Sequence, residues 1–252
     1  MPIEFGIVLA VAAVLLGCVL QRTSGMGVGL VVSPALVLLI GPAQGVLLTN
    51  ATAVVSAALM TIAVRSDVDW GRYARIAPVV VLGAVPAAVL VREAGPGWLE
   101  LIIGAVLLVS VGGTTLLPRL PEVPARPAGL AAGILGGFLN TAVGVASPAF
   151  LAYARVTSWG QRGFAATLQP IFLTLGLVSI IVKALLGSVP DADLSSWPLM
   201  LAVMAAVPVG VLLGGALSRR FSTTGARRLA VGVVVLGAAG TLVRGVVQLL
   251  GA

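Results

Sequence analysis

The stretch GMGVGLVVSPAL at residues 25–36 decides the fold, because a glycine-rich interruption leads there directly into an apolar run. Its tripeptide Ser33-Pro34-Ala35 returns as Ser147-Pro148-Ala149, again after a locally polar break that contains glycine. The offset between the copies grows from 114 residues (33 to 147) to 128 residues (104 to 232), as loops of changed length would produce. We therefore predict a duplicated unit, with residues 1–120 as the first repeat and 121–252 as the second. Further pairs keep the same order: Thr49 with Thr167, Ala84-Val85-Pro86 with Ala206-Val207-Pro208, and Gly104 and Gly112 with Gly232 and Gly240.

The composition points to a membrane protein. Of 252 residues, 59% are apolar and 9% charged, with a mean hydropathy of +1.15, which is too little polar surface for a water-facing globule of this size. Hydrocarbon about 30 Å thick needs roughly 20 apolar residues per helix. The sequence thus predicts an all-α polytopic protein with about eight membrane segments, or up to ten if two hairpins are counted by their arms. The long apolar runs are 3–20, 44–64, 73–91, 98–117, 128–153, 164–186, 197–217 and 228–250, and a shorter one is 27–40.

The arginines indicate how the halves are oriented. If cytoplasmic loops carry the positive charge, the run 128–153 must begin and end inside, so it forms a hairpin of two short arms. The corresponding hairpin, 3–40, then begins and ends outside, the two halves are inverted copies, and both termini lie outside. The alternative is eight simple spans, which makes the halves parallel and leaves one basic group outside; we favour inversion. The basic groups are Arg65, Arg72 and Arg75; Arg119 and Arg126; Arg155 and Arg162; and Arg219, Arg220, Arg227 and Arg228.

The tips of the two hairpins are the expected functional site. Residues 21–24, Gln-Arg-Thr-Ser, precede the glycine cluster of the first, and Asn140-Thr141 precedes Gly144 in the second. Non-helical backbone at membrane depth must line protein or water. Helix N-termini that follow Gly25 and Gly144 offer unpaired N–H groups to an anion, and glycine lets the backbone approach it closely. The alternative role for these glycines is to let helices cross closely.

Polar side chains near the tips complete the candidate site. Arg22 is either a flanking cytoplasmic residue or a buried cation that meets a negative ligand. Thr49, Thr52 and Ser56 share a helix face and form either a hydrogen-bonding wall or bonds to their own helix backbone. The amides of Asn50, Gln169 and Gln21 are poorly satisfied in lipid. The candidate substrate-binding residues are Gln21, Arg22, Ser24, Gly27, Ser33, Thr49, Asn50, Thr52, Asn140, Thr141, Ser147, Thr167 and Gln169.

Several function classes are excluded by composition. The chain has no histidine and one cysteine, which argues against a zinc site and against Ser-His catalysis. The eight acidic residues stand at span ends or in loops, and no nucleotide-binding motif stands out. We expect no enzyme activity, no metal and no cofactor. The expected partners are a small anion and the lipid bilayer, not nucleic acid, since the arginines are scattered over short loops. A proton or sodium as coupling ion, and a homo-oligomer, stay open.

The chain resembles the sulfite exporter TauE/SafE family, the four-TMS sulfite, sulfoacetate or sulfonate permeases. The resemblance rests on the cluster at 25–29 leading into Ser33-Pro34-Ala35-Leu36, on Thr49-Asn50-Ala51-Thr52, and on the second-half counterparts at Gly144, 147–149 and Thr167. It implies a multi-pass permease of the bacterial inner membrane for small sulfur-containing or organic anions such as sulfite, thiosulfate or sulfoacetate. The second hairpin has one glycine where the first has three, so the resemblance leads us to expect an asymmetric site.

The membrane potential favours one direction of transport. It is worth about 2.3 kcal/mol per elementary charge per 100 mV, and the inside is negative, so an anion leaves downhill. Export then needs no coupling ion, in agreement with the few titratable groups inside the spans. Two other classes stay open, a gated anion channel and a non-transporting scaffold subunit. Saturation of the flux separates the channel from a permease, and tolerance of substitutions at Arg22, Asn50 or Gln169 separates the scaffold.

Overall fold

A computed structural model describes residues 3–116, 122–189, 197–217 and 223–251, and over these residues the protein is helical without β-strands. The prediction of an all-α polytopic membrane protein is confirmed. The first half holds α1 (Ile3–Ser24), α2 (Val28–Ile40), α3 (Pro42–Val64), η1 (Arg65–Asp67), α4 (Trp70–Ile76), η2 (Ala77–Val79), α5 (Val80–Glu93) and α6 (Pro96–Leu116). The second holds α7 (Ala125–Val143), α8 (Ser147–Val156), α9 (Gln161–Leu185), α10 (Trp197–Leu217) and α11 (Thr223–Leu250).

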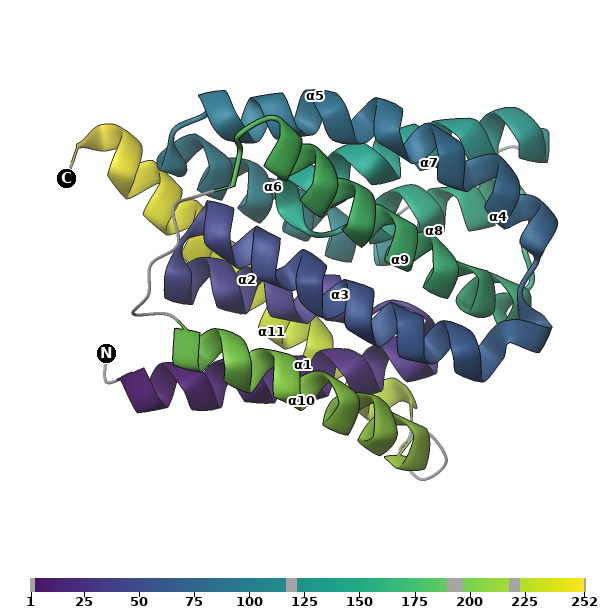
Figure 1. Ribbon diagram of the computed structural model, residues 1–252, viewed down its shortest axis with the longest axis horizontal. Coiled ribbons are helices and arrows are strands. Elements are labelled where there is room, and N and C mark those ends of the chain that lie inside the picture. The colour runs from purple at the N-terminus through teal and green to yellow at the C-terminus, as the bar shows by residue number, and fades with distance from the viewer. Residues whose placement is uncertain (1–2, 117–121, 190–196, 218–222, 252) are drawn as a thin grey trace.

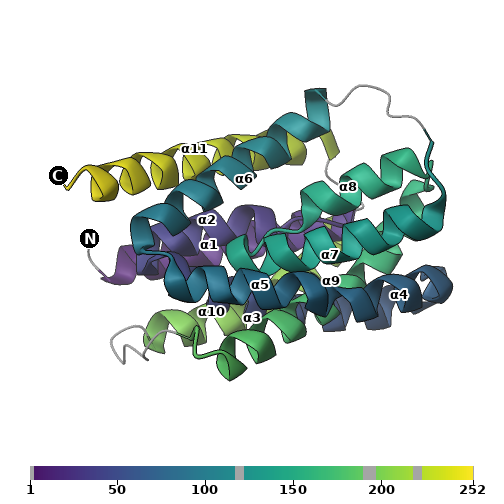
Figure 2. The ribbon, with the colours of Figure 1, turned by 90° about the horizontal axis from the view of Figure 1, so that it is seen from above.

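The described helices form an elongated bundle (Figure 1). The first helix, α1, begins at the same end of the bundle at which the last helix, α11, ends. The α3–α4 connection, the start of α7, the end of α8 and the start of α9 lie at the opposite end (Figures 1 and 2). Those segments carry six of the arginines used for the topology prediction: Arg65, Arg72, Arg75, Arg126, Arg155 and Arg162. Arg119, Arg219 and Arg220 lie outside the described residues, and the side chains of Arg227 and Arg228 are not described.

Each half begins with a helix that breaks and turns back. The first pair has 22 and 13 residues and the second 19 and 10, so at 1.5 Å per residue the arms span about 33 and 20 Å, and about 28 and 15 Å. The expectation of two short arms in the second hairpin is therefore wrong for α7, because helical hydrogen bonding continues unbroken from Ala125 to Val143. Both breaks use a glycine with left-handed backbone, Gly25 with φ +82° and Gly144 with φ +77°.

The helices of the two halves pack against each other reciprocally. α1 packs on α10 and α7 packs on α5, while α3 meets α9 and α6 meets α11. In the same way α2 contacts α11 and α8 contacts α6. Each contact thus has a counterpart with the halves exchanged, as a two-fold related pair of repeats would give.

The outer surface of the bundle is apolar. Six described helices are long and apolar enough to cross a membrane, and two shorter apolar helices accompany them. Ile62, Leu212 and Leu236 are 69–75% exposed on the outside, which a water-soluble surface rarely tolerates over so many helices. The bundle therefore presents a lipid-facing belt around its polar interior.

One ion pair crosses the bundle near the end that holds the termini. Glu100 of α6 is fully buried and lies 3.1 Å from the guanidinium of Arg244 in α11, at a distance that suits a salt bridge but without the alignment of a hydrogen bond. Arg244 also donates to the carbonyl oxygen of Leu38 at 2.7 Å. The pair therefore fastens the C-terminal turn of α2, where helix carbonyls lack partners of their own.

Candidate functional site

Two glutamines hold the tip of the first hairpin. The side-chain nitrogen of Gln169 in α9 donates to the carbonyl oxygen of Gly25 at 3.2 Å, and that of Gln21 donates to Gln169 Oε1 at 2.9 Å. Gln21 Oε1 accepts from the backbone N–H of Val28 at 3.3 Å. One of the N–H groups that we expected to be free for an anion at the start of α2 is thus already used. Ser24 closes the same turn, since its hydroxyl bonds the carbonyl oxygen of Met26 at 2.6 Å.

The glutamine pair is nearly saturated with hydrogen bonds. Gln169 uses both N–H groups, because it also donates to Ala165 O at 2.9 Å. Gln21 uses one of its two N–H groups among the described residues. The hydrogen-bonded pair Gln21–Gln169, called the Gln21–Gln169 fastening below, therefore holds the tip in place. It leaves one amide hydrogen, on Gln21, for another partner.

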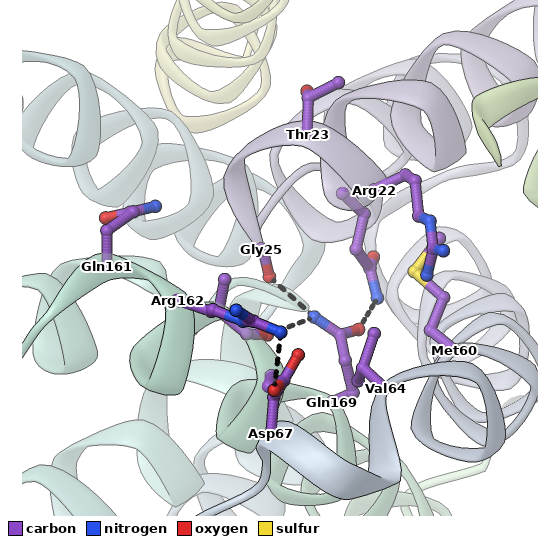
Figure 3. A pocket seen from close by; sticks show the side chains of 12 residues that line it. Arg22, Thr23, Gly25, Met60, Val64, Asp67, Gln161, Arg162 and Gln169 are labelled. Carbon is purple, nitrogen blue, oxygen red and sulfur yellow. Dashed lines mark hydrogen bonds and ion pairs between the residues drawn. The ribbon is translucent and has the colours of Figure 1, made fainter. Parts of the chain in front are cut away.

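A pocket of about 220 Å³ lies beside this fastening, at the basic end of the bundle. Figure 3 shows Arg22, Gly25 and Gln169 on its wall together with Arg162 and Asp67. Arg162 and Asp67 pair at 3.0 Å, whereas Arg22 has no ion-pair or hydrogen-bond partner within the described part of the chain. The pocket is thus lined both by the guanidinium of Arg22, which has no ion-pair partner among the described residues, and by the first hairpin tip.

The tip of the second hairpin is dry and tightly enclosed. Ser33 of α2, fully buried, donates to the carbonyl oxygen of Val143 at 2.6 Å. A Cβ on Gly29 would come within 2.5 Å of the carbonyl oxygen of Gly144, so the two broken helices touch each other backbone to backbone. Thr49 closes the other side, with its methyl group 3.2 Å from the Cβ position of Gly144.

Three polar side chains from three helices meet near this second tip. Asn140 of α7 donates to Asn50 Oδ1 at 3.0 Å, and Asn50 of α3 donates to Ser179 Oγ of α9 at 2.7 Å. All three are at most 5% exposed. Burial in the protein answers the problem that an amide faces in lipid, and it ties α3, α7 and α9 together.

The hydroxyls of Thr49, Thr52 and Ser56 in α3 form hydrogen bonds to the backbone of their own helix. Thr49 donates to Gly45 O at 2.7 Å, and Thr52 donates to Thr49 O at 2.7 Å. Ser56 donates to Ala53 O at 3.2 Å. They face into the bundle, as their spacing predicts, but each gives its hydrogen to its own helix.

The remaining candidates have mixed surroundings. Thr167 lies in α9 at the position that repeats Thr49, is fully buried, and accepts the backbone N–H of Asp69 at 2.8 Å. Gly27 is closely enclosed by α1, where a Cβ would meet the backbone of Gln21. Ser147 is buried at the start of α8, and Thr141 is buried with no partner for its hydroxyl among the described residues.

Sequence reasoning missed four residues near these groups. Ser179 lies ten residues after Gln169, about 80° away around α9, so the spacing from Gln169 gives no signal for it. Asp67 and Arg162 are loop-flanking residues that look like ordinary surface charge until the fold brings them to the pocket. Lys183 had no signal beyond its being the single lysine of the chain.

The described residues contain no group of metal-ligating side chains, and their polar groups gather in two places, the pocket tip and the asparagine cluster. A helical membrane bundle with two broken helices that meet inside it is the architecture of a membrane transporter. The chain belongs to the sulfite exporter TauE/SafE family, whose model matches residues 9–241. The resemblance inferred from the motifs is thereby confirmed. No curated protein and no solved structure matches the chain.

Proposed function

We propose that the protein is a permease that exports a small sulfur-containing or organic anion, such as sulfite, thiosulfate or sulfoacetate. The observation that carries the proposal is the pocket at the basic end, which brings Arg22 against the first hairpin tip. Arg22 is part-buried and has no ion-pair partner among the described residues, so its charge is available to a negative ligand beside the broken helix. Membership of a family of sulfite exporters supports the same class of substrate.

The pocket serves as the cytoplasmic entrance in this proposal. The excess of arginine at that end marks it as the inner side under the positive-inside rule. Arg22 and Arg162 attract the anion, and the free N–H of Gln21 receives it at the wall beside the tip. Movement of the anion onward requires the Gln21–Gln169 fastening to open, because it holds the tip in place.

The same reasoning supports inverted repeats and a location in the bacterial inner membrane. α1 and α7 occupy reciprocal positions, yet they run in opposite directions along the bundle (Figures 1 and 2). Both termini are then outside. Export down the potential gains about 2.3 kcal/mol per charge per 100 mV, and the pathway needs no coupling ion for that direction.

Flux through purified protein in liposomes tests the proposal. We expect saturable efflux of sulfite, thiosulfate or sulfoacetate that speeds up when the compartment holding the anion is made negative. Sulfate and chloride at the same ionic strength serve as comparison anions. Flux that does not depend on the potential would count against export driven by charge. No flux for any sulfur-containing or organic anion tested would reject the permease.

Two other functions are separated by the same assay. A gated anion channel gives currents that rise without saturation over the range in which a permease saturates. A scaffold subunit gives no flux, and substitution at Arg22 or Gln169 then leaves its function intact as long as the protein folds. Neither is favoured by an observation in the structure.

A further inference from the structure

One charged side chain inside the bundle has no role in the pocket. Lys183 of α9 is 1% exposed, and its ammonium nitrogen has no hydrogen-bond partner among the described residues. The neighbouring part of α9 packs through Val182 against Ala84 and Ala88 of α5, which offer it only apolar surface. A buried ammonium without a partner is among the most costly arrangements that a protein interior can hold.

The described carboxylates do not compensate this charge. Asp67 pairs with Arg162, Asp69 with Arg72, Glu93 with Arg92 and Glu100 with Arg244. Two carboxylates stand outside these pairs: Glu122 accepts from the hydroxyl of Ser158, and Glu4 is exposed in the first turn of α1. Lys183 is thus left facing the interior without a negative group from the described chain.

The position of Lys183 connects it to the asparagine cluster. Lys183 follows Ser179 by four residues, one helical turn on the same face of α9. Side chains of an α-helix lean towards its N-terminus, so the stem of Lys183 lies over the turn that holds Ser179. From Gln169 to Lys183 is 14 residues, or about 21 Å along the helix, so one face of α9 leads from the pocket to the last turn of α9.

Several donors around Ser179 have no described partner. Asn50 and Asn140 each use one of two amide hydrogens within the described structure, and the hydroxyl of Thr141 has no partner there. The ammonium of Lys183, one turn further along α9, also has no hydrogen-bond partner among the described residues. An oxyanion is the ligand whose lone pairs and charge would satisfy them.

We propose that Lys183 is the cationic contact of a second anion subsite, deeper than the pocket and formed with Asn50, Asn140 and Thr141. This proposal rests on the proposed anion permease and adds the step that follows release from the pocket. The ligand is a small oxyanion, and the subsite fills when the Gln21–Gln169 fastening opens. Lys183 lies in the last turn of α9, so it gives the anion a positive contact near the end of that helix opposite the pocket.

The single lysine makes a direct test possible. Protein grown with lysine ¹³C-labelled at Cε shows one lysine side-chain signal in lipid nanodiscs. Titration with sulfite and with thiosulfate should shift this signal saturably, whereas chloride at equal ionic strength should not. The variant R22Q, which changes the pocket alone, should keep a saturable shift. A signal that stays unmoved by every anion that the protein transports would overturn the subsite and leave the permease standing.

A charge-removing variant gives the second readout. K183M keeps the length of the side chain without its charge, so we expect at least tenfold lower anion flux and a melting temperature equal to or above that of wild type. K183R, which keeps a cation, should recover part of the flux. Wild-type flux in K183M, or a markedly lower melting temperature of K183M, would overturn the proposal. Absence of all anion flux in the wild type would instead reject the permease itself.

Discussion

The two hairpin tips are built from similar sequence but held in different ways. The first is held by side-chain hydrogen bonds at the edge of a pocket, where Gln169 donates to the carbonyl oxygen of Gly25. The second is enclosed, with Ser33 bonded to Val143 O and the asparagine cluster one turn away. The hydrogen bonds of both tips are buried, but those of the first line a pocket from which water can compete for them. The first tip is therefore the part suited to move, and the second is the part suited to stay.

Breaking the asparagine cluster should give the largest effect. N50A removes the acceptor of Asn140 and the donor to Ser179, which leaves buried polar atoms without partners. We expect the free energy of unfolding to fall by about 1–3 kcal/mol, and flux about 100-fold because α3, α7 and α9 lose their common register. Thermal unfolding in nanodiscs and liposome flux measure the two quantities.

The control for N50A is S110A. Ser110 is as buried as Asn50 but donates only to Val106 O of its own helix, at 2.6 Å. Its loss should change stability and flux little. If N50A behaved like S110A, the second tip would not be the fixed part of the molecule.

Removing a hydrogen bond at the first tip should lower stability and flux less than N50A does. Q169A frees the carbonyl of Gly25 beside the pocket, where water can take its place, so the free energy of unfolding should fall by only about 1 kcal/mol. Flux should change about tenfold, because the tip is no longer held at the entrance. A double-mutant cycle with Q21A should give a coupling of about 1 kcal/mol in stability. Additive losses would show that the two glutamines do not act as a pair.

Much of this arrangement is predictable from the sequence. The broken helices at Gly25 and Gly144 follow from glycine clusters inside apolar runs, and the burial of Gln21, Asn50 and Gln169 follows from the cost of an amide in lipid. The pairing of Gln21 with Gln169, 148 residues apart, depends on how α1 and α9 pack and has no local signal. The sequence therefore predicts which polar side chains are buried, but not which hydrogen-bond partner each of them has.

The same limit applies to Thr167. It occupies the position that repeats Thr49, but its hydroxyl accepts the backbone N–H of Asp69, a partner that no motif predicts. The length of α7 was not expected, because the distribution of arginines put both ends of the run 128–153 on one side and so predicted two short arms. The repeated motifs thus predict where a residue lies in the fold better than they predict its hydrogen-bond partner.

The pocket charges should change affinity without changing the fold. R22Q removes the unpaired guanidinium, so the half-saturating anion concentration should rise on the order of threefold, more at low salt than at high salt. D67N removes the negative charge opposite Arg162 and should shift the concentration in the other direction. Flux measured against anion concentration at two ionic strengths tests both. Equal effects of R22Q and D67N would mean that the pocket charge does not steer the anion.

The smallest effect is expected at Ser56, and it decides how the wall of α3 works. Ser56 is fully buried on the face that also holds Thr49, but its hydrogen goes to Ala53 O of its own helix. S56A should therefore alter the free energy of unfolding by about 0.5 kcal/mol or less and leave flux within about twofold of wild type. A large loss of flux at unchanged stability would show that the hydroxyl meets the anion through its lone pairs. The anion would then contact the α3 face as well as the Lys183 subsite, and the contrast between a moving first tip and a fixed second one would have to be abandoned.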